Sequence, residues 1–212
     1  MGGEDAGGVC GAEGERVLKA RLMFSKQITI DAELRLVEPR HCEEIFALVD
    51  KNRAHLRRWM PWVDGSRSVE DVRKWQQTAA EQFAKNNGFH AGLWWQGKIV
   101  GMIGFHAMDW NHRRTSIGYW LDEASQGKGL MTAACRAMTR HALGELKLNR
   151  VEIRCAVENE RSRAIPKRLG FSEEGTLRQV EWLYDHFVDH VVFSLLSSEI
   201  AKLDAASQAV TR

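Results

Sequence analysis

The segment Gln126–Thr132 reads Gln-Gly-Lys-Gly-Leu-Met-Thr and contains residue types suited to binding an anion. It leads into apolar residues at helical spacing over Leu130–Leu146. The first turn of a helix presents unpaired N–H groups and the positive end of the helix dipole, which together favour a bound phosphate. The glycines allow the backbone to approach a ligand closely, and Lys128 adds a positive charge. We therefore predict a phosphate-binding site at the start of this helix.

The spacing in this segment excludes two common nucleotide-binding loops. A P-loop requires a glycine where the chain has Asp122, and Ser or Thr where it has Gly129. The dinucleotide-binding fingerprint requires a third glycine where Thr132 stands. The predicted phosphate site is therefore of a different kind.

Two segments resemble motifs of the GNAT acetyltransferases. Gln126-x-x-Gly129-x-Met131 is similar to the acyl-CoA signature Arg/Gln-x-x-Gly-x-Gly/Ala of that family, and Met131 departs from it at the last position. Just upstream, Ile117-Gly118-Tyr119-Trp120-Leu121 resembles the fourth strand of the family fold.

Further segments extend the resemblance in the expected order. Asn159-x-x-Ser162, followed by Leu169-Gly170-Phe171, resembles the segment after the fifth strand. Leu56-x-x-Trp59-Met60-Pro61-Trp62 and the ending Asp189–Leu196 look like the Rim-type (RimJ/RimL-like) branch, which acetylates the N-termini of ribosomal proteins. The similarity extends from about residue 28 to about residue 200.

The resemblance implies an α+β fold with an α/β three-layer arrangement. A mixed, mostly antiparallel GNAT-like sheet would be flanked by helices, and its fourth and fifth strands, Thr115–Leu121 and Arg150–Val157, would splay apart. The pantetheine arm of acetyl-CoA, the implied co-substrate, would enter this gap and pair with strand backbone. Gly118 would permit that close approach, and Asn159 would contact the pantetheine amides. The coenzyme-binding residues implied in this way are Trp120, Leu121, Gln126, Gly127, Lys128, Gly129, Leu130, Met131, Thr132, Asn159 and Ser162.

A basic run follows the second of these strands. It comprises Arg161, Arg163, Lys167 and Arg168. Such a run is either a counter-charge for the coenzyme phosphates or a solvated helix face. The sequence leaves both interpretations open.

Direct acyl transfer requires a donor to the developing oxyanion and a stabilised thiolate. We expect the oxyanion donor to be a backbone N–H near Tyr119–Leu121. The resemblance implies that the Ser162 hydroxyl points at the coenzyme sulfur. The alternative is that Ser162 is a plain helix N-cap, because Pro166 requires its helix to begin only a few residues earlier.

The general base is not evident from the sequence. Relatives often carry a glutamate where this chain has Ser116, which cannot serve as a base at neutral pH. A protein α-amine has a pKa near 7.7–8.0, against about 10.4 for lysine, so it needs less help to become neutral. This difference favours an N-terminal amine as the acceptor.

Five other residues are candidates for the acceptor side. Each of His112, Asp189 and Tyr184 is either part of a proton relay or an ordinary surface or core residue. Trp59 and Trp62 either pack in the core or line the acceptor groove.

Composition supports one domain. The chain has 212 residues, of which 44% are hydrophobic and 27% are charged, and its net charge is +2. We predict a disordered extension over residues 1–22, an acetyltransferase domain over 23–205 and a short tail over 206–212. No apolar run is long enough to span a bilayer and no signal peptide is evident, so we expect a cytoplasmic protein.

Metal binding is not expected. The four cysteines form no Cys-x-x-Cys pair and match neither a disulfide framework nor a zinc site: Cys10, Cys42, Cys135 and Cys155. His186 and His190 stand four residues apart, but no third group of ligands accompanies them.

Local patterns predict the elements. Strands are expected at Ile28–Val37, Ala91–Trp95, Lys98–Met108, Thr115–Leu121, Arg150–Val157, Gly175–Arg178 and Val188–Leu196. Helices are expected at Pro39–Val49, at Val69–Lys85 with Ser68 as its N-cap, at Leu130–Leu146, and in a short stretch ending at Leu169. A further helical stretch is expected within Arg53–Val63 and ends at Pro61.

The sequence thus predicts an acetyl-CoA-dependent N-acetyltransferase acting on a protein N-terminus. A small-molecule amine such as a polyamine or amino-sugar is the alternative acceptor, and a non-catalytic coenzyme-binding module is the alternative function. Nucleic acid is not expected as the main ligand except indirectly through the ribosome, because the net charge is near zero and no base-stacking motif is present. A homodimer is compatible with the sequence, which does not specify the oligomeric state.

Overall fold

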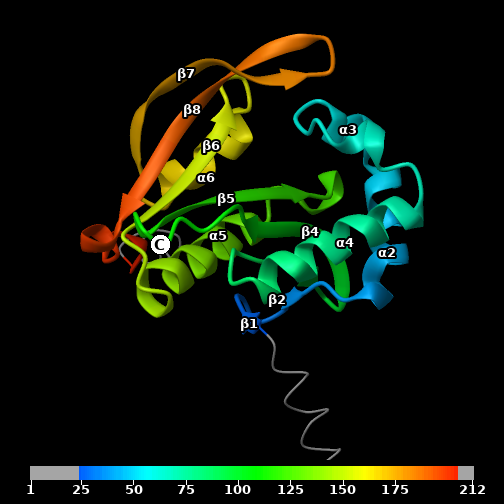
Figure 1. Ribbon diagram of the computed structural model, residues 1–212, viewed down its shortest axis with the longest axis horizontal. Coiled ribbons are helices and arrows are strands. Elements are labelled where there is room, and N and C mark those ends of the chain that lie inside the picture. The colour runs from blue at the N-terminus through cyan, green and yellow to red at the C-terminus, as the bar shows by residue number, and fades with distance from the viewer. Residues whose placement is uncertain (1–23, 205–212) are drawn as a thin grey trace, which may run out of the picture.

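The computed structural model describes residues 24–204 (Figure 1). The strands are β1 (Ser25–Gln27), β2 (Ala32–Leu36), β3 (His90–Trp95), β4 (Lys98–Phe105), β5 (Arg114–Leu121), β6 (Arg150–Ala156), β7 (Ser172–Leu183) and β8 (His186–Leu196). The α-helices are α2 (Cys42–Lys51), α3 (Arg53–Arg57), α4 (Val69–Ala84), α5 (Leu130–Arg140) and α6 (Glu160–Arg168). Short 3-10 turns are η1 (Pro39–His41), η2 (Val63–Gly65), η3 (Glu123–Ser125) and η5 (Ser197–Glu199), and α5 continues into a π-helical turn, η4 (His141–Glu145). The predicted extension over residues 1–22 and the tail over 206–212 lie outside the described residues.

All these strands form one sheet in the order β1-β2-β3-β4-β5-β6-β8-β7. Every neighbouring pair is antiparallel except β5 and β6, which are parallel. Successive residues of a strand face opposite sides of the sheet, and the core divides accordingly. Leu93 and Ile103 pack with α5 and α6 on one face, whereas Trp94 and Met102 pack with α2 and α4 on the other. This three-layer arrangement confirms the predicted fold class.

Two local signals in the sequence are confirmed at residue level. Ser68 is the N-cap of α4, and its Oγ accepts a hydrogen bond from Asp71 N at 3.3 Å. Gln96 and Gly97 join β3 to β4, and both have positive φ angles, as a tight two-residue hairpin turn requires. Both features depend on residues adjacent in the chain.

Three of the differences from the predicted element boundaries have a clear structural cause. The strand expected over 28–37 begins only at Ala32, because Ile28 N and Thr29 N both bond to Ala32 O and turn the chain between β1 and β2. Helix α3 ends at Arg57, four residues before Pro61, where Trp59 N and Met60 N turn back onto Leu56 O.

The third difference is in the closing strand pair, which is longer than predicted. Strand β7 begins at Ser172 and ends at Leu183 because it pairs with β8 along most of its length. Strand β7 is an edge strand and nearly all its residues are exposed. Its polar composition therefore lacks the apolar alternation from which a strand is recognised.

Strands β5 and β6 separate partway along their length. Their pairing ends at Ile117 opposite Ile153, although β5 continues to Leu121 and β6 continues to Ala156. Figure 1 shows the two strands diverging, with β6 following β8. The predicted splay is therefore present, and we call the opening between the two strands the β5–β6 gap.

Candidate active site

Backbone groups of β5 face the β5–β6 gap. Two hydrogen bonds fix the pairing of β4 with β5. Asp122 N donates to Val100 O at 2.7 Å at one end of the pair, and His106 N donates to Ser116 O at 2.9 Å at the other. Hydrogen-bonded pairs alternate along an antiparallel ladder, so the intervening residues turn their N–H groups away from β4. The N–H groups of Tyr119 and Leu121 therefore point toward the gap.

The same alternation applies on the β6 side. Val157 N donates to Asp189 O at 3.0 Å in the ladder with β8. Arg154 and Ala156 fall on the alternate positions and turn their backbone polar groups toward β5. An extended ligand lying in the gap therefore meets strand backbone on both sides.

A cavity of about 570 Å³, which we call the loop cavity, extends from the gap to the start of α5. Gly127 and Gly129 lie at this helix start with φ angles of 77° and 74°, and Gly129 is the N-cap without a side-chain cap. No atom lies within 4 Å of the place a Cβ would occupy at either glycine. All the residues predicted to bind coenzyme line this cavity: Trp120, Leu121, Gln126, Gly127, Lys128, Gly129, Leu130, Met131, Thr132, Asn159 and Ser162.

The basic run after β6 divides into two pairs. Arg161 and Arg168 line the loop cavity. Arg163 instead donates to Val157 O at 2.7 Å, and Lys167 pairs with Glu173 at 3.2 Å. Only the first pair is placed to meet the phosphates of a ligand in the loop cavity.

His55 also lines the loop cavity and was not singled out in the sequence. Its Nε2 lies 2.9 Å from Gln126 Nε2, and Gln126 Oε1 accepts a hydrogen bond from Arg161. This chain of polar groups holds the side chain of Gln126 beside the glycine turn. His55 belongs to α3, so no signal near the signature could have identified it.

Ser162 is not the N-cap of α6. Asn159 holds that position, and its Oδ1 accepts a hydrogen bond from Ser162 N at 3.1 Å. The capping alternative for Ser162 is therefore wrong. Its half-buried side chain lies beside the gap and close to the Tyr119 hydroxyl, whose pKa it influences.

The side chain of Tyr119 crosses from β5 to α6. Its hydroxyl donates to Ser162 O at 3.0 Å and lies 3.9 Å from Cys155 Sγ. Burial raises the pKa of Tyr119 well above its ordinary value, so the phenol stays neutral. Tyr119 therefore fixes the start of α6 relative to β5.

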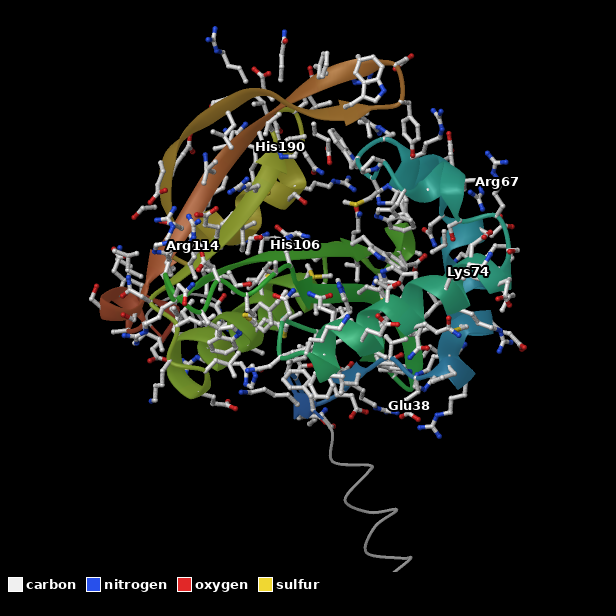
Figure 2. The ribbon with its side chains drawn as sticks, viewed as in Figure 1. Glu38, Arg67, Lys74, His106, Arg114 and His190 are labelled. Atoms are coloured by element: carbon white, nitrogen blue, oxygen red, sulfur yellow. The ribbon has the colours of Figure 1, made fainter. Side chains whose placement is uncertain are left out.

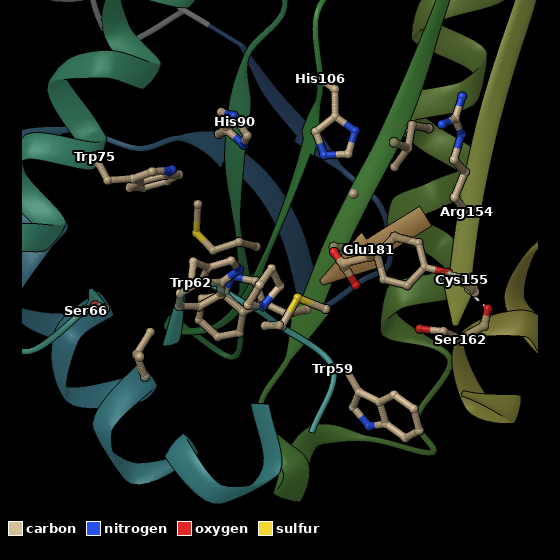
Figure 3. A pocket seen from close by; sticks show the side chains of 18 of the residues that line it. Trp59, Trp62, Ser66, Trp75, His90, His106, Arg154, Cys155, Ser162 and Glu181 are labelled. Carbon is tan, nitrogen blue, oxygen red and sulfur yellow. Dashed lines mark hydrogen bonds between the residues drawn. The ribbon is translucent and has the colours of Figure 1, made fainter. Parts of the chain in front are cut away.

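A second cavity of about 880 Å³, which we call the aromatic cavity, lies on the other side of the gap (Figure 3). Four tryptophans line it: Trp59, Trp62, Trp75 and Trp120. The Trp62 and Trp120 rings are 6.0 Å apart between centroids. Trp62 is 38% exposed and Trp59 is half-buried, so both line the cavity and neither is a core residue. Residues lining both cavities are Trp59, Met60, Tyr119, Trp120, Asn159 and Ser162, and the two cavities therefore meet at the gap.

Two polar pairs face the aromatic cavity, and the sequence analysis predicted neither. Glu181 Oε2 lies 3.1 Å from His190 Nε2, on the β7–β8 side. His106 lies on the sheet side (Figures 2 and 3). Its Nδ1 is 2.8 Å from Ser116 Oγ. Ser116, which stands where relatives often carry a glutamate, is thus hydrogen-bonded to the imidazole of His106.

The two imidazoles on the sheet side resist protonation. His106 is exposed at the edge of the cavity, and partial desolvation, followed by Arg154, lowers its pKa. Burial and the neighbouring His106 lower the pKa of His90 to about 4. A Cβ at Gly118 would lie only 2.8 Å from His106 Nε2, so this glycine makes room for the ring, which is a different reason from the one predicted.

The three predicted relay candidates do not line either cavity. His112 lies in the exposed loop before β5. Asp189 Oδ1 accepts from Gln179 N at 2.7 Å, and Tyr184 donates to Met60 O at 2.6 Å. These contacts make Asp189 and Tyr184 structural residues of the β7–β8 hairpin.

Neither a metal cluster nor a membrane helix is found in the part of the chain that the structure describes. Between residues 24 and 204, no three His, Cys, Asp or Glu side chains gather closely enough to hold a metal ion. No helix in that range is long and apolar enough to cross a bilayer.

Comparisons with known proteins agree with this geometry. The profile of the acetyltransferase (GNAT) domain matches residues 32–172. A Bacillus subtilis (strain 168) protein, provisionally named ribosomal N-acetyltransferase YdaF, is 38% identical over 84% of this chain and 97% of its own length. The ribosomal-protein-serine acetyltransferase of Escherichia coli (strain K12) is 30% identical over 77% of this chain and 91% of its own.

A solved structure gives the same result. The structure of RimL, a ribosomal L7/L12 alpha-N-protein acetyltransferase in complex with coenzyme A, matches with a TM-score of 0.79 and 28% identity over 82% of this chain and 98% of that one. The chain belongs to the GNAT acetyltransferase family. It is an acetyl-CoA-dependent N-acetyltransferase.

Proposed function

We propose that this enzyme transfers the acetyl group of acetyl-CoA directly to the N-terminal α-amine of a ribosomal protein. The observation that carries the proposal is that the loop cavity and the aromatic cavity meet at the β5–β6 gap. Coenzyme and acceptor can then approach one reaction centre from opposite sides. The named activities of the relatives support a ribosomal-protein acceptor. We place the reaction in the cytoplasm, where newly made ribosomal proteins are available.

In this proposal the coenzyme occupies the loop cavity and the gap. Its pyrophosphate accepts hydrogen bonds from the backbone N–H groups at the start of α5, where Gly127 and Gly129 leave the backbone accessible. Arg161 and Arg168 provide positive charge beside it. The pantetheine arm lies along the gap and pairs with the exposed strand edges, and Asn159 contacts its amides.

The reaction forms an N–C bond and breaks the C–S bond of the thioester. The N–H groups of Tyr119 and Leu121 face the gap and stabilise the oxyanion that develops on the carbonyl. Ser162 Oγ lies beside the gap and donates to the departing thiolate. No covalent enzyme intermediate is needed, because both reactants bind at once.

An acceptor screen tests this function. Purified enzyme and acetyl-CoA are mixed with peptides that begin with serine or alanine, with matched N-blocked peptides containing lysine, with spermidine and with an amino-sugar. Thiol release and peptide mass are measured. We expect one acetyl group on the unblocked N-terminus and none on the lysine of the blocked peptide. Transfer only to the small amines, or coenzyme binding without transfer to any amine, would refute the proposal.

A further inference from the structure

His106 follows the last residue of β4 and projects into the aromatic cavity (Figure 3). Its Nδ1 is 2.8 Å from Ser116 Oγ, on the neighbouring strand β5. In the tautomer with hydrogen on Nδ1, the ring donates this hydrogen bond to Ser116. Nε2 then carries a free lone pair and faces the cavity.

Nε2 also lies close to the expected reaction centre. It stands 2.8 Å from the position that a Cβ on Gly118 would occupy. A carbon–carbon bond of about 1.5 Å therefore puts Nε2 within about 4.3 Å of Gly118 Cα. Gly118 directly precedes Tyr119, whose N–H faces the gap. The imidazole therefore lies against the residue that precedes the N–H expected to hold the thioester carbonyl, on the side of the aromatic cavity.

The surroundings of His106 favour a neutral ring. His106 is an exposed residue at the edge of the cavity, where partial desolvation and then Arg154 lower its pKa; Arg154 is itself held by Glu152 at 2.8 Å. The titratable and charged groups that share the aromatic cavity are His90 on β3, Tyr119 on β5, Arg154 and Cys155 on β6, Glu181 on β7, His190 on β8 and Asp71 on α4. Glu181 pairs with His190 on the opposite side of the cavity. The lone pair on His106 is consequently available at neutral pH.

We propose that His106, oriented by Ser116, accepts the proton that the acceptor ammonium loses before it attacks the thioester. This inference rests on the proposed function, because it requires an amine acceptor in the aromatic cavity. The proton passes from the α-ammonium to Nε2, and the imidazolium later releases it to solvent. The second proton leaves nitrogen as the tetrahedral intermediate collapses and ends on the coenzyme sulfur. One ammonium and one thioester thus give one amide, one thiol and one released proton.

The test compares His106→Ala, His106→Gln and wild type on the N-terminal peptide substrate. We expect kcat/KM at pH 7 to fall about 100-fold in both variants, within the usual range for loss of a general base. Acetyl-CoA affinity, measured by calorimetry, stays within about twofold of wild type, since His106 does not line the loop cavity. Added imidazole restores part of the activity of His106→Ala, but not that of His106→Gln, whose side chain fills the space.

The pH profile provides a second readout. Wild-type kcat/KM is flat between the lowered pKa of His106 and the α-amine pKa near 7.7–8.0, because the enzyme deprotonates bound ammonium. In His106→Ala the rate follows the free amine and rises about tenfold per pH unit up to that pKa. His112→Ala is the matched control, since this exposed histidine lines neither cavity, and it keeps the wild-type profile.

Two outcomes separate this inference from the proposed function. If wild type acetylates peptide N-termini but His106→Ala keeps the flat profile, or loses activity equally at every pH without imidazole rescue, His106 is not the proton acceptor. If wild type acetylates no peptide N-terminus, the proposed function is itself overturned and this inference with it.

Discussion

The Tyr184 hydroxyl donates a hydrogen bond of 2.6 Å to the carbonyl oxygen of Met60. The bond joins the turn between β7 and β8 to the segment after α3, two parts of the chain that meet above the sheet. Met60 lines both cavities, so the contact helps to position residues at the gap. The Arg57 guanidinium lies 3.9 Å from the centroid of the Tyr184 ring and also binds Asp64 at 2.9 Å, which reinforces the junction.

Replacing this tyrosine tests the role of the junction. Tyr184→Phe removes only the hydroxyl, and we expect it to lower the free energy of unfolding by ~1 kcal/mol. The KM for a peptide acceptor should rise about fivefold, the equivalent of ~1 kcal/mol, while coenzyme affinity is unchanged. His186→Gln, on the same turn but exposed and paired with Asp185, should leave both quantities unaltered. Equal peptide KM values for Tyr184→Phe and wild type would contradict this role.

Gly129→Glu should abolish acetyl-CoA binding in calorimetry. The new carboxylate would lie against the pyrophosphate, and the left-handed φ of 74° strains any side chain. Gly97→Glu is a matched control, because Gly97 has a similar φ of 78° and equally open surroundings but lines neither cavity. Both variants should lose about 1–2 kcal/mol of stability from backbone strain. Coenzyme binding retained by Gly129→Glu would place the pyrophosphate elsewhere.

Ser162→Ala should lower kcat about tenfold or more with little effect on coenzyme affinity, since in the proposed mechanism the hydroxyl donates to the departing thiolate. Thermal stability should not change, because Asn159 and not Ser162 caps α6. Asn159→Ala supplies the contrast and should cost ~1 kcal/mol of stability through the lost cap. A Ser162→Ala variant whose only defect is in melting temperature would argue against the thiolate role.

Glu174 should make the fold sensitive to acid. Hydrogen bonds from Arg150 and then from Ser194, at 2.7 Å and 2.6 Å to Oε1, lower the pKa of Glu174 to about 2. A carboxyl whose pKa is lowered on folding stabilises the protein at pH values above the pKa it has in the unfolded chain. This stabilisation is lost as pH falls from about 4.3 toward 2.

Urea unfolding at pH 7 and pH 3 measures this contribution. The side chain of Glu174 is 40% exposed, so solvent screening limits the effect to ~1 kcal/mol. Glu174→Gln should be less stable than wild type at pH 7, and the difference should shrink at pH 3. A difference that is the same at both pH values would mean that the charge on Glu174 does not contribute.

Much of the coenzyme side could be predicted because its determinants are local in sequence. The spacing of Gln126, Gly127 and Gly129 before an apolar helix pattern identified the loop cavity, and all the predicted coenzyme residues do line it. Helix-terminal N–H groups and glycine turns depend on a few consecutive residues, so they are readable without a fold. The Ser68 cap and the Gln96–Gly97 turn were predictable for the same reason.

The composition of the aromatic cavity was decided by tertiary structure. His106 meets Ser116 across a strand pair, and Glu181 meets His190 across a hairpin whose exposed edge strand showed no apolar alternation. Strand register, not spacing along the chain, determines which side chains share such a face. The sequence by itself therefore determined the glycine turn and helix start that line the loop cavity. Only the folded sheet, through the point at which β5 and β6 stop pairing, decided which groups line the aromatic cavity.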